Sequence, residues 1–127
     1  MPIQTPIEKW SGQVQTLTLG ATPADGGTRT RTVTVGGETT LPFLQFEGEI
    51  PHLPVAAIEI KSRRPTDWSP LLQDAWGDAL DDPAAWAHAA EEVGADLIQL
   101  TLTLEDTPAD AQAVLRDVLA ATGLPLL

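Results

Sequence analysis

The stretch DPAAWAHAAEEVGADLIQLTL, residues 82–102, decides the fold expected for this chain. Asp82 suits a helix N-cap, and Pro83 suits the first helical position. Gly94 stands where a glycine commonly ends a helix, and the apolar run 96–102 then predicts a core strand. One apolar helix face is predicted by residues at i, i+3, i+4 and i+7, namely Trp86, Ala89, Ala90 and Val93.

The same alternation continues on both sides of this stretch. Residues 55–60 predict a short buried strand, and mixed signals at 69–80 allow a short helix. Residues 108–122 predict a second long helix closed by Gly123, and 124–127 begin a third strand. Strands that alternate with helices predict a parallel sheet with right-handed crossovers. The apolar face expected for the second helix consists of Ala111, Val114, Leu115, Val118 and Leu119.

The N-terminal third has a different pattern. Apolar and polar residues alternate over 13–19 and again over 30–35, and a loop rich in Gly, Pro and Asp lies between them at 20–27. This pattern predicts an antiparallel ribbon over 13–37. Residues 38–54 have no steady period and predict an ordered connector.

Composition excludes several classes of function. The net charge of −11, from 18 acidic and 7 basic residues, disfavours nucleic acid and anionic membranes as partners. Without cysteine the chain cannot form a disulfide or bind an iron–sulfur cluster through thiolates. No apolar run reaches the roughly 20 residues of a membrane span, and no secretory signal pattern opens the sequence. We therefore expect a cytoplasmic protein.

Eight short strings, in order along the chain, carry a family resemblance. They include LGAT (19–22), GGTR (26–29), VGGE (35–38), LPF (41–43), FEGE (46–49) and GADLI (94–98). The sequence resembles the N-terminal region of the small subunit of the corrinoid iron–sulfur protein, which is the delta subunit of acetyl-CoA decarbonylase/synthase.

The resemblance implies a fold, a partner and a role. The family's small subunit is a TIM barrel paired with a large subunit that carries a cobamide and a [4Fe–4S] cluster. The pair carries a methyl group from a methylated pterin to acetyl-CoA synthase in the Wood–Ljungdahl pathway. We therefore expect an α/β fold in which residues 1–127 form one N-terminal portion of a barrel domain: ribbon 13–37, connector 38–54 and strand–helix units 55–127. Only two of the barrel's eight strand–helix units are present.

Four weak candidates for the edge of a shared pocket lie where barrels place their sites, at the carboxyl ends of strands. They are Glu59, Lys61, Thr101 and Thr103. The structural alternatives are a buried ion pair between Glu59 and a neighbouring strand, and a solvated Lys61. His88 has no expected ligand partner at i+4, and no metal or catalytic residue is predicted. The cofactors are expected on the partner subunit, with none bound by this chain alone.

The FEGE string also has two interpretations. Glu47 and Glu49 form a possible clamp for a cation or an arginine, but we favour a structural loop that packs Phe43 and Phe46, with Gly48 in an unusual backbone conformation. The glycine pairs at 26–27 and 36–37 are expected in turns, since neither has a phosphate-loop pattern.

Two other functions stay open beside the non-catalytic partner. One is an enzyme that uses carboxylates such as Glu49 and Glu59 as acid and base, although no spacing supports it. The other is a truncated barrel fragment without activity, which self-associates through open sheet edges.

Overall fold

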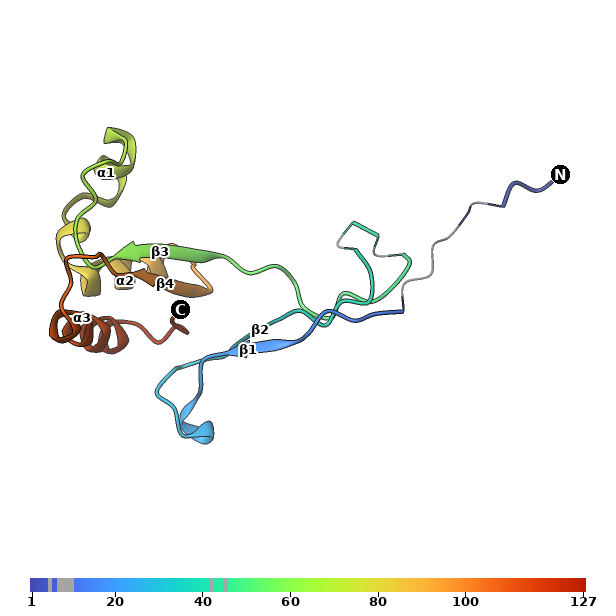
Figure 1. Cartoon of the computed structure of the whole chain (residues 1–127), viewed down its shortest axis with the longest axis horizontal. Coiled ribbons are helices and arrows are strands. Elements are labelled where there is room, and N and C mark those ends of the chain that lie inside the picture. Colours follow the sequence, from blue (N-terminus) through green and yellow to red (C-terminus); the bar gives the residue numbers. More distant parts are fainter. Residues whose placement is uncertain (5, 7–10, 42, 45) are drawn as a thin grey trace. The chain divides into compact units, whose positions relative to one another are not determined.

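The computed structural model describes residues 1–4, 6, 11–41, 43–44 and 46–127. The chain divides into two compact units. The first comprises Met1–Thr18 and Thr34–Pro54, and the second comprises Leu19–Val33 and Val55–Leu127. Figure 1 follows the elements along the chain. No helix in these described ranges is long and apolar enough to cross a bilayer.

A short antiparallel sheet confirms the predicted ribbon. Strands β1 (Leu17–Leu19) and β2 (Val33–Val35) pair with each other. The N–H of Val14 donates to the Glu38 carbonyl at 2.8 Å, which continues the pairing beyond both strands. The regular strands have three residues each and are shorter than the predicted runs. Between them the loop contains one 3-10 turn, η1 (Pro23–Asp25).

Gly26 lies in a turn, as predicted, whereas Gly36 and Gly37 follow β2, and the Gly37 N–H donates across the ribbon to the Val14 carbonyl at 3.0 Å. Gly26, Gly36 and Gly37 have φ values of 80°, 86° and 87°, a region that other residues rarely adopt. A Cβ on Gly36 would also lie 2.1 Å from the Gln15 carbonyl oxygen. Both the backbone conformation and the space therefore require glycine there.

The connector contains no helix or strand among its described residues, 38–41, 43–44 and 46–54. The predicted packing of its aromatic rings is wrong, because Phe43 and Phe46 are 74% and 82% exposed. Gly48 is not in a left-handed conformation either. Position 48 still requires glycine, because a Cβ there would lie 2.8 Å from the Cβ of Thr40.

The second unit contains the predicted parallel sheet. Strand β3 (Ala57–Lys61) pairs in parallel with β4 (Leu97–Thr101), with Lys61 opposite Thr101. A parallel bridge joins Ile98 to Leu126, and the Leu127 N–H donates to the Ile98 carbonyl at 2.9 Å. The chain thus begins the expected third strand beside β4.

Three α-helices follow the predicted pattern. They are α1 (Pro70–Trp76), which continues into the 3-10 turn η2 (Gly77–Asp81), α2 (Pro83–Glu92) and α3 (Pro108–Ala121). Each begins with a proline, and each is preceded by a residue whose side chain accepts a backbone N–H, respectively Ser69, Asp82 and Thr107. These caps satisfy donors that have no partner within the helix.

Helix α2 ends at the predicted glycine. Gly94 has φ 96°, and its N–H donates to the Glu91 carbonyl at 3.0 Å. The next N–H, from Ala95, donates to the Ala90 carbonyl at 3.1 Å. These two bonds form a Schellman motif, which turns the chain directly into β4.

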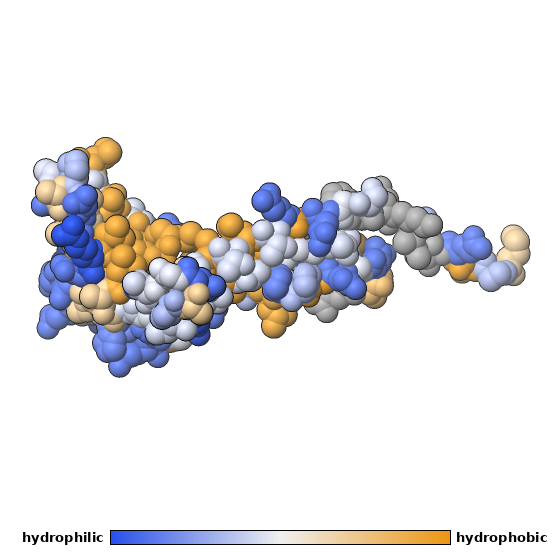
Figure 2. All heavy atoms as spheres, turned by 90° about the horizontal axis from the view of Figure 1, so that it is seen from below, coloured by the Kyte–Doolittle hydropathy of each residue, from blue (hydrophilic) through white to orange (hydrophobic). Residues whose placement is uncertain are grey.

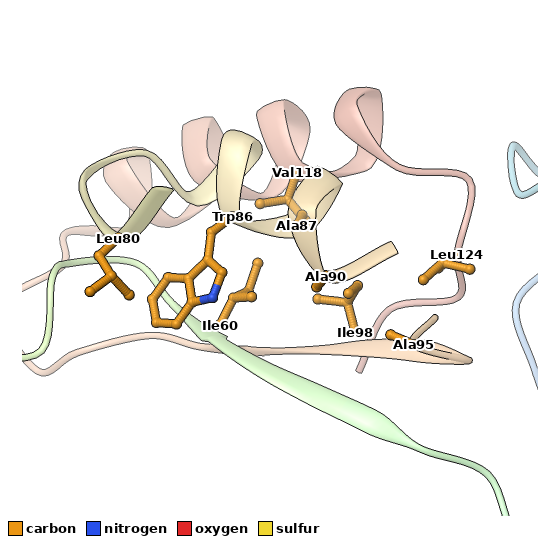
Figure 3. Packing of buried hydrophobic residues seen from close by; sticks show 9 residues of the cluster. All are labelled: Ile60, Leu80, Trp86, Ala87, Ala90, Ala95, Ile98, Val118 and Leu124. Carbon is orange, nitrogen blue, oxygen red and sulfur yellow. The ribbon is translucent and has the colours of Figure 1, made fainter. Parts of the chain in front are cut away.

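The hydrophobic core lies between the helices and one face of the parallel sheet (Figure 3). Trp86 and Ala90 are buried as predicted, but Ala87 is buried where Ala89 was expected, and Val93 is 68% exposed. The buried face of α2 is therefore rotated relative to the predicted one. Alanines on several sides of the helix make more than one apolar stripe possible. The core residues are Ile60, Leu80, Trp86, Ala87, Ala90, Ala95, Ile98, Val118 and Leu124.

The two faces of the parallel sheet differ. Ile60 and Ile98 point into the core, whereas on the opposite face Glu59 and Gln99 are exposed and Leu97 is buried. The helices of this unit therefore cover one face of the sheet. Two strands and a bridge do not close a barrel, so the structure shows an α/β unit and leaves the barrel as a proposal.

Candidate functional site

The candidate site is the carboxyl edge, which we define as the carboxyl ends of β3 and β4 with the loops 62–69 and 102–107 that follow them. Asp106 joins the two loops. Its carboxylate accepts the Ser62 hydroxyl and the Thr103 N–H, the latter at 2.7 Å, and it pairs with the Arg63 Nε at 3.0 Å. The Asp106 side chain is only 4% exposed.

These contacts hold Asp106 in its ionised form. The Ser62 hydroxyl, followed by the Thr103 N–H, lowers the pKa of Asp106 to about 2. The same arrangement raises the pKa of Arg63, chiefly through its hydrogen bond to Asp106. A carboxylate with so low a pKa is a poor general acid or base near neutral pH. Asp106 therefore serves as an anchor between loops.

Glu59 and Thr101, two of the predicted site residues, are in direct contact. The Thr101 hydroxyl donates to Glu59 Oε1 at 2.7 Å across the β3–β4 pair. The suggested buried ion pair is wrong, because Glu59 is exposed and its partner is a hydroxyl. The exposed carboxylate keeps free acceptor positions for a ligand or a partner side chain.

Lys61 and Thr103 have separate neighbours at the same edge. The Lys61 ammonium lies 5.6 Å from the centre of the Trp68 ring, within range of a cation–π interaction. Lys61 is half-buried, so the alternative prediction of a simply solvated Lys61 is wrong. Thr103 is also half-buried and is tied to Asp106. All four predicted residues therefore lie at the carboxyl edge, with one direct pair among them.

An aromatic cluster lies beside this edge. The Trp68 ring meets the Trp86 ring edge to face, with centroids 5.4 Å apart, and Trp76 lies 6.0 Å from Trp86. Trp86 is fully buried. The cluster therefore connects the loop that carries Trp68 to the core.

Exposed leucines occur in the loop after β4 and in the nearby helix α1. Leu71 and Leu72 belong to α1, whereas Leu102 and Leu104 follow β4, and Leu104 is fully exposed at 107%. Figure 2 shows apolar residues, in orange, gathered at the end of the picture that holds α1 and the parallel sheet. Charged, hydroxyl and apolar groups side by side suit recognition of a surface that is itself partly apolar.

The remaining polar candidates lie elsewhere. His88 does have a partner at i+4, contrary to expectation, since its Nε2 lies 3.7 Å from the Glu92 carboxylate on an exposed helix face. Glu49 belongs to the first unit and Glu59 to the second. Within the described ranges, no three His, Cys, Asp or Glu side chains are placed to hold a metal ion.

Sequence reasoning missed Asp106, Ser62 and Arg63. Their contacts join residues more than 40 positions apart, which no local pattern reveals. The available signal was the spacing Thr103-x-x-Asp106 just after a core strand and just before a helix cap. Such a position in a parallel sheet lies where binding residues concentrate.

Comparison with known proteins identifies relatives of this chain. It is 44% identical over 94% of its length to the protein of Archaeoglobus fulgidus called acetyl-CoA decarbonylase/synthase complex subunit delta. The delta 1 subunit of Methanosarcina thermophila is 32% identical over the same share, and the delta subunit of Methanopyrus kandleri is 30% identical over 91%. The expected family resemblance is confirmed.

This chain is similar to part of these delta subunits. It spans 28% to 30% of the length of the three relatives. No protein-family model matches it. Several strings that carried the resemblance have structural roles in the second unit. Gly27, for example, leaves space for the Ala21 carbonyl, since a Cβ there would lie 2.1 Å from that oxygen.

Proposed function

We propose that this chain forms the first strand–helix units of a (β/α)8 barrel in a delta-type small subunit. In this role it is a non-catalytic partner of a corrinoid methyl carrier, supporting methyl transfer from a methyl-pterin to acetyl-CoA synthase in the Wood–Ljungdahl pathway. The observation that carries the proposal is the 44% identity to a delta subunit over 94% of this chain. The relatives' name describes them as subunits of a complex, which supports a partner protein.

The one-sided parallel sheet supports the barrel. Parallel sheets are almost always covered on both faces, and here the helices cover only the face of Ile60 and Ile98. In a barrel, helices surround the outside and the other face of each strand points inward. Glu59 and Gln99, which are paired in register, would then face the interior.

The carboxyl edge is the proposed contact with the partner. Barrel proteins place their sites at this end, and Glu59, Lys61, Thr101 and Thr103 all lie there. We propose that they form one side of a pocket shared with the large subunit. In the resembled family that subunit holds the cobamide and the [4Fe–4S] cluster.

The residues present fit the side of a cobamide pocket. The corrin ring carries amide side chains, for which Lys61 offers a donor and Glu59 an acceptor. The exposed Leu102 and Leu104 offer apolar contact beside them. The chain has no cysteine, so it offers no thiolate for the cluster. When bound, the corrinoid supplies the methyl-carrying chemistry. This chain's residues orient the partner and exclude water.

Binding of this chain to a cobamide-carrying large subunit tests the proposal. Leu104→Glu places a charge on the most exposed leucine of the carboxyl edge, whereas Val93→Glu places one on an exposed valine at the end of α2. We expect Leu104→Glu to weaken binding by about tenfold or more, and Val93→Glu to leave it unchanged. Calorimetry with each variant measures the difference. No binding of the unmodified chain would refute the proposed role, and equal losses in both variants would refute the proposed edge.

A further inference from the structure

The most completely bonded charge in the second unit is Arg29, which lies outside the carboxyl edge. It is 7% exposed, and no carboxylate pairs with it among the described residues. Instead its guanidinium donates to three backbone carbonyls and a hydroxyl. The acceptors are the carbonyls of Leu119 (2.7 Å), Thr122 (2.8 Å) and Leu124 (3.3 Å), and the Thr28 hydroxyl, which receives two bonds at 3.3 and 3.0 Å.

These bonds use all five N–H groups of the guanidinium, one from Nε and two from each terminal nitrogen. The Leu119 and Thr122 carbonyls lie at the carboxyl end of α3, where the helix dipole favours a positive charge, and the Leu124 carbonyl follows just beyond it. The Leu119 carbonyl is free to accept because the Gly123 N–H turns to the Glu91 carboxylate, 3.4 Å away. Arg29 therefore caps the helix from a segment 90 residues earlier.

Other contacts of the same segment lie at the amino ends of β4 and of the third strand. The Thr30 N–H donates to the Gly123 carbonyl at 2.9 Å, just before the third strand. Arg31 donates to the Ala95 carbonyl at 2.8 Å, just before β4. Figure 3 shows Ala95 and Leu124 together at one end of the core, away from Leu80.

Two glycines permit this close approach. A Cβ on Gly123 would lie 2.4 Å from the side chain of Thr30, and one on Gly20 would lie 3.0 Å from Pro125. Gly123 is not in a left-handed conformation, so its requirement for glycine comes from the approach of Thr30 alone. Leu124 and Pro125 are buried at this end of the strands.

We infer that Leu19–Val33 is an amino-end plug, a segment that covers the amino ends of β4 and of the third strand and is held there by the guanidinium of Arg29. Arg29 is thus a positioning residue. It fixes the plug against the turn from α3 into the third strand, and the plug covers Leu124 and Pro125. The carboxyl edge, at the other end of the strands, is not covered by the plug. This inference does not depend on the identity of the partner.

Hydrogen exchange on the intact chain tests the plug. Arg29→Lys keeps the charge but has only three donors and no planar fork. We expect the Thr30 amide to exchange about tenfold faster or more in this variant, while amides of β3 and β4 keep their protection. Arg116→Lys is the matched control, because Arg116 is exposed on α3. It should leave all these amides unchanged.

Chemical rescue separates the guanidinium from general packing. In Arg29→Ala, guanidinium ion at concentrations far below those that denature should restore protection of the Thr30 amide, while sodium chloride of equal ionic strength should not. If Arg29→Lys unfolds the whole chain, Gly123→Ala decides, since it displaces Thr30 without touching Arg29. Two results would overturn the inference. One is an unchanged exchange rate of the Thr30 amide in Gly123→Ala, and the other is a Thr30 amide that is unprotected in the unmodified chain.

Discussion

Ser62 and Asp106 lie 44 residues apart and are joined by a hydrogen bond from the hydroxyl to the carboxylate. The bond connects the loop after β3 to the loop after β4. It is also the largest cause of the low pKa of Asp106. The geometry of the carboxyl edge and the acid response of this protein therefore depend on the same carboxylate.

Acid should loosen the carboxyl edge. The pKa of Asp106 is lowered from 3.8 to about 2 on folding, so the folded state favours its ionised form. Its contribution to stability is complete above the unfolded pKa and is lost as the pH falls from about 4 towards 2. Asp106→Asn should therefore reduce stability at neutral pH and flatten the pH dependence between 4 and 2. Thermal unfolding as a function of pH measures both effects.

Asp110 provides the control for that experiment. Its pKa is also lowered, chiefly by the Thr107 hydroxyl of the α3 capping box. Asp110→Asn should weaken the start of α3 without releasing Ser62 from Asp106. If Asp106→Asn retains the full acid sensitivity of the unmodified chain, Asp106 is not the group that links pH to stability.

Truncation of Trp86 should destabilise the second unit strongly. The ring is fully buried in the core and meets both Trp68 and Trp76. Replacing a buried tryptophan by alanine typically costs about 3–5 kcal/mol. Trp86→Ala should lower the denaturant midpoint by a corresponding amount. Trp86→Phe should cost less, since the Trp86 N–H has no hydrogen-bond partner among the described residues and only volume is lost.

The exposed Val93 provides the control for Trp86. It belongs to the stripe that the sequence predicted, but it is largely exposed. Val93→Ala should therefore change the denaturant midpoint little. A large loss for Val93→Ala, together with a small one for Trp86→Ala, would mean that α2 packs in the originally predicted register.

Local signals predicted the helices and strands well. The cap at Asp82, the proline that follows it, and Gly94 act within a few residues, so their effect is visible in sequence. The orientation of α2 was less predictable, because alanine occurs on several sides of the helix and each stripe looks equally apolar. Tertiary contact with Ile60 and Ile98 selects the stripe that is buried.

Long-range polar contacts were the least predictable. The four residues proposed for the carboxyl edge followed from the rule that parallel strands present their carboxyl ends together. Asp106 did not, because its partners depend on which loops meet in space. Arg29 was hidden more deeply. Its partners beyond Thr28 are backbone carbonyls at least 90 positions later, and carbonyls leave no residue pattern in a sequence.

We expect the isolated chain to self-associate. Its parallel sheet has one face without helices, and the leucines Leu71, Leu102 and Leu104 are exposed in the same unit. Open strand edges and apolar surface both promote pairing between chains. Size-exclusion chromatography with light scattering should show oligomers or a broad profile at raised concentration. A sharp monomer peak of high stability would contradict this expectation.

The isolated chain should bind neither cobamide nor metal ions with useful affinity. A corrinoid is a large ligand, and strong binding requires a concave site that buries most of its surface. Glu59, Lys61 and Thr101 line one edge of two parallel strands, so they offer contacts from one side only. The residues that would complete the pocket belong, in our proposal, to the partner subunit.

Titration of the purified chain with cobalamin, followed by absorbance and calorimetry, measures this affinity. We expect no saturable binding at micromolar concentrations and binding only after the large subunit is added. The paired variant Glu59→Gln and Thr101→Val then separates edge contacts from subunit docking, because it removes the 2.7 Å contact of the carboxyl edge and leaves the exposed leucines in place. Stoichiometric binding by the chain alone would contradict the division of roles proposed here, since this unit would then hold the cofactor itself.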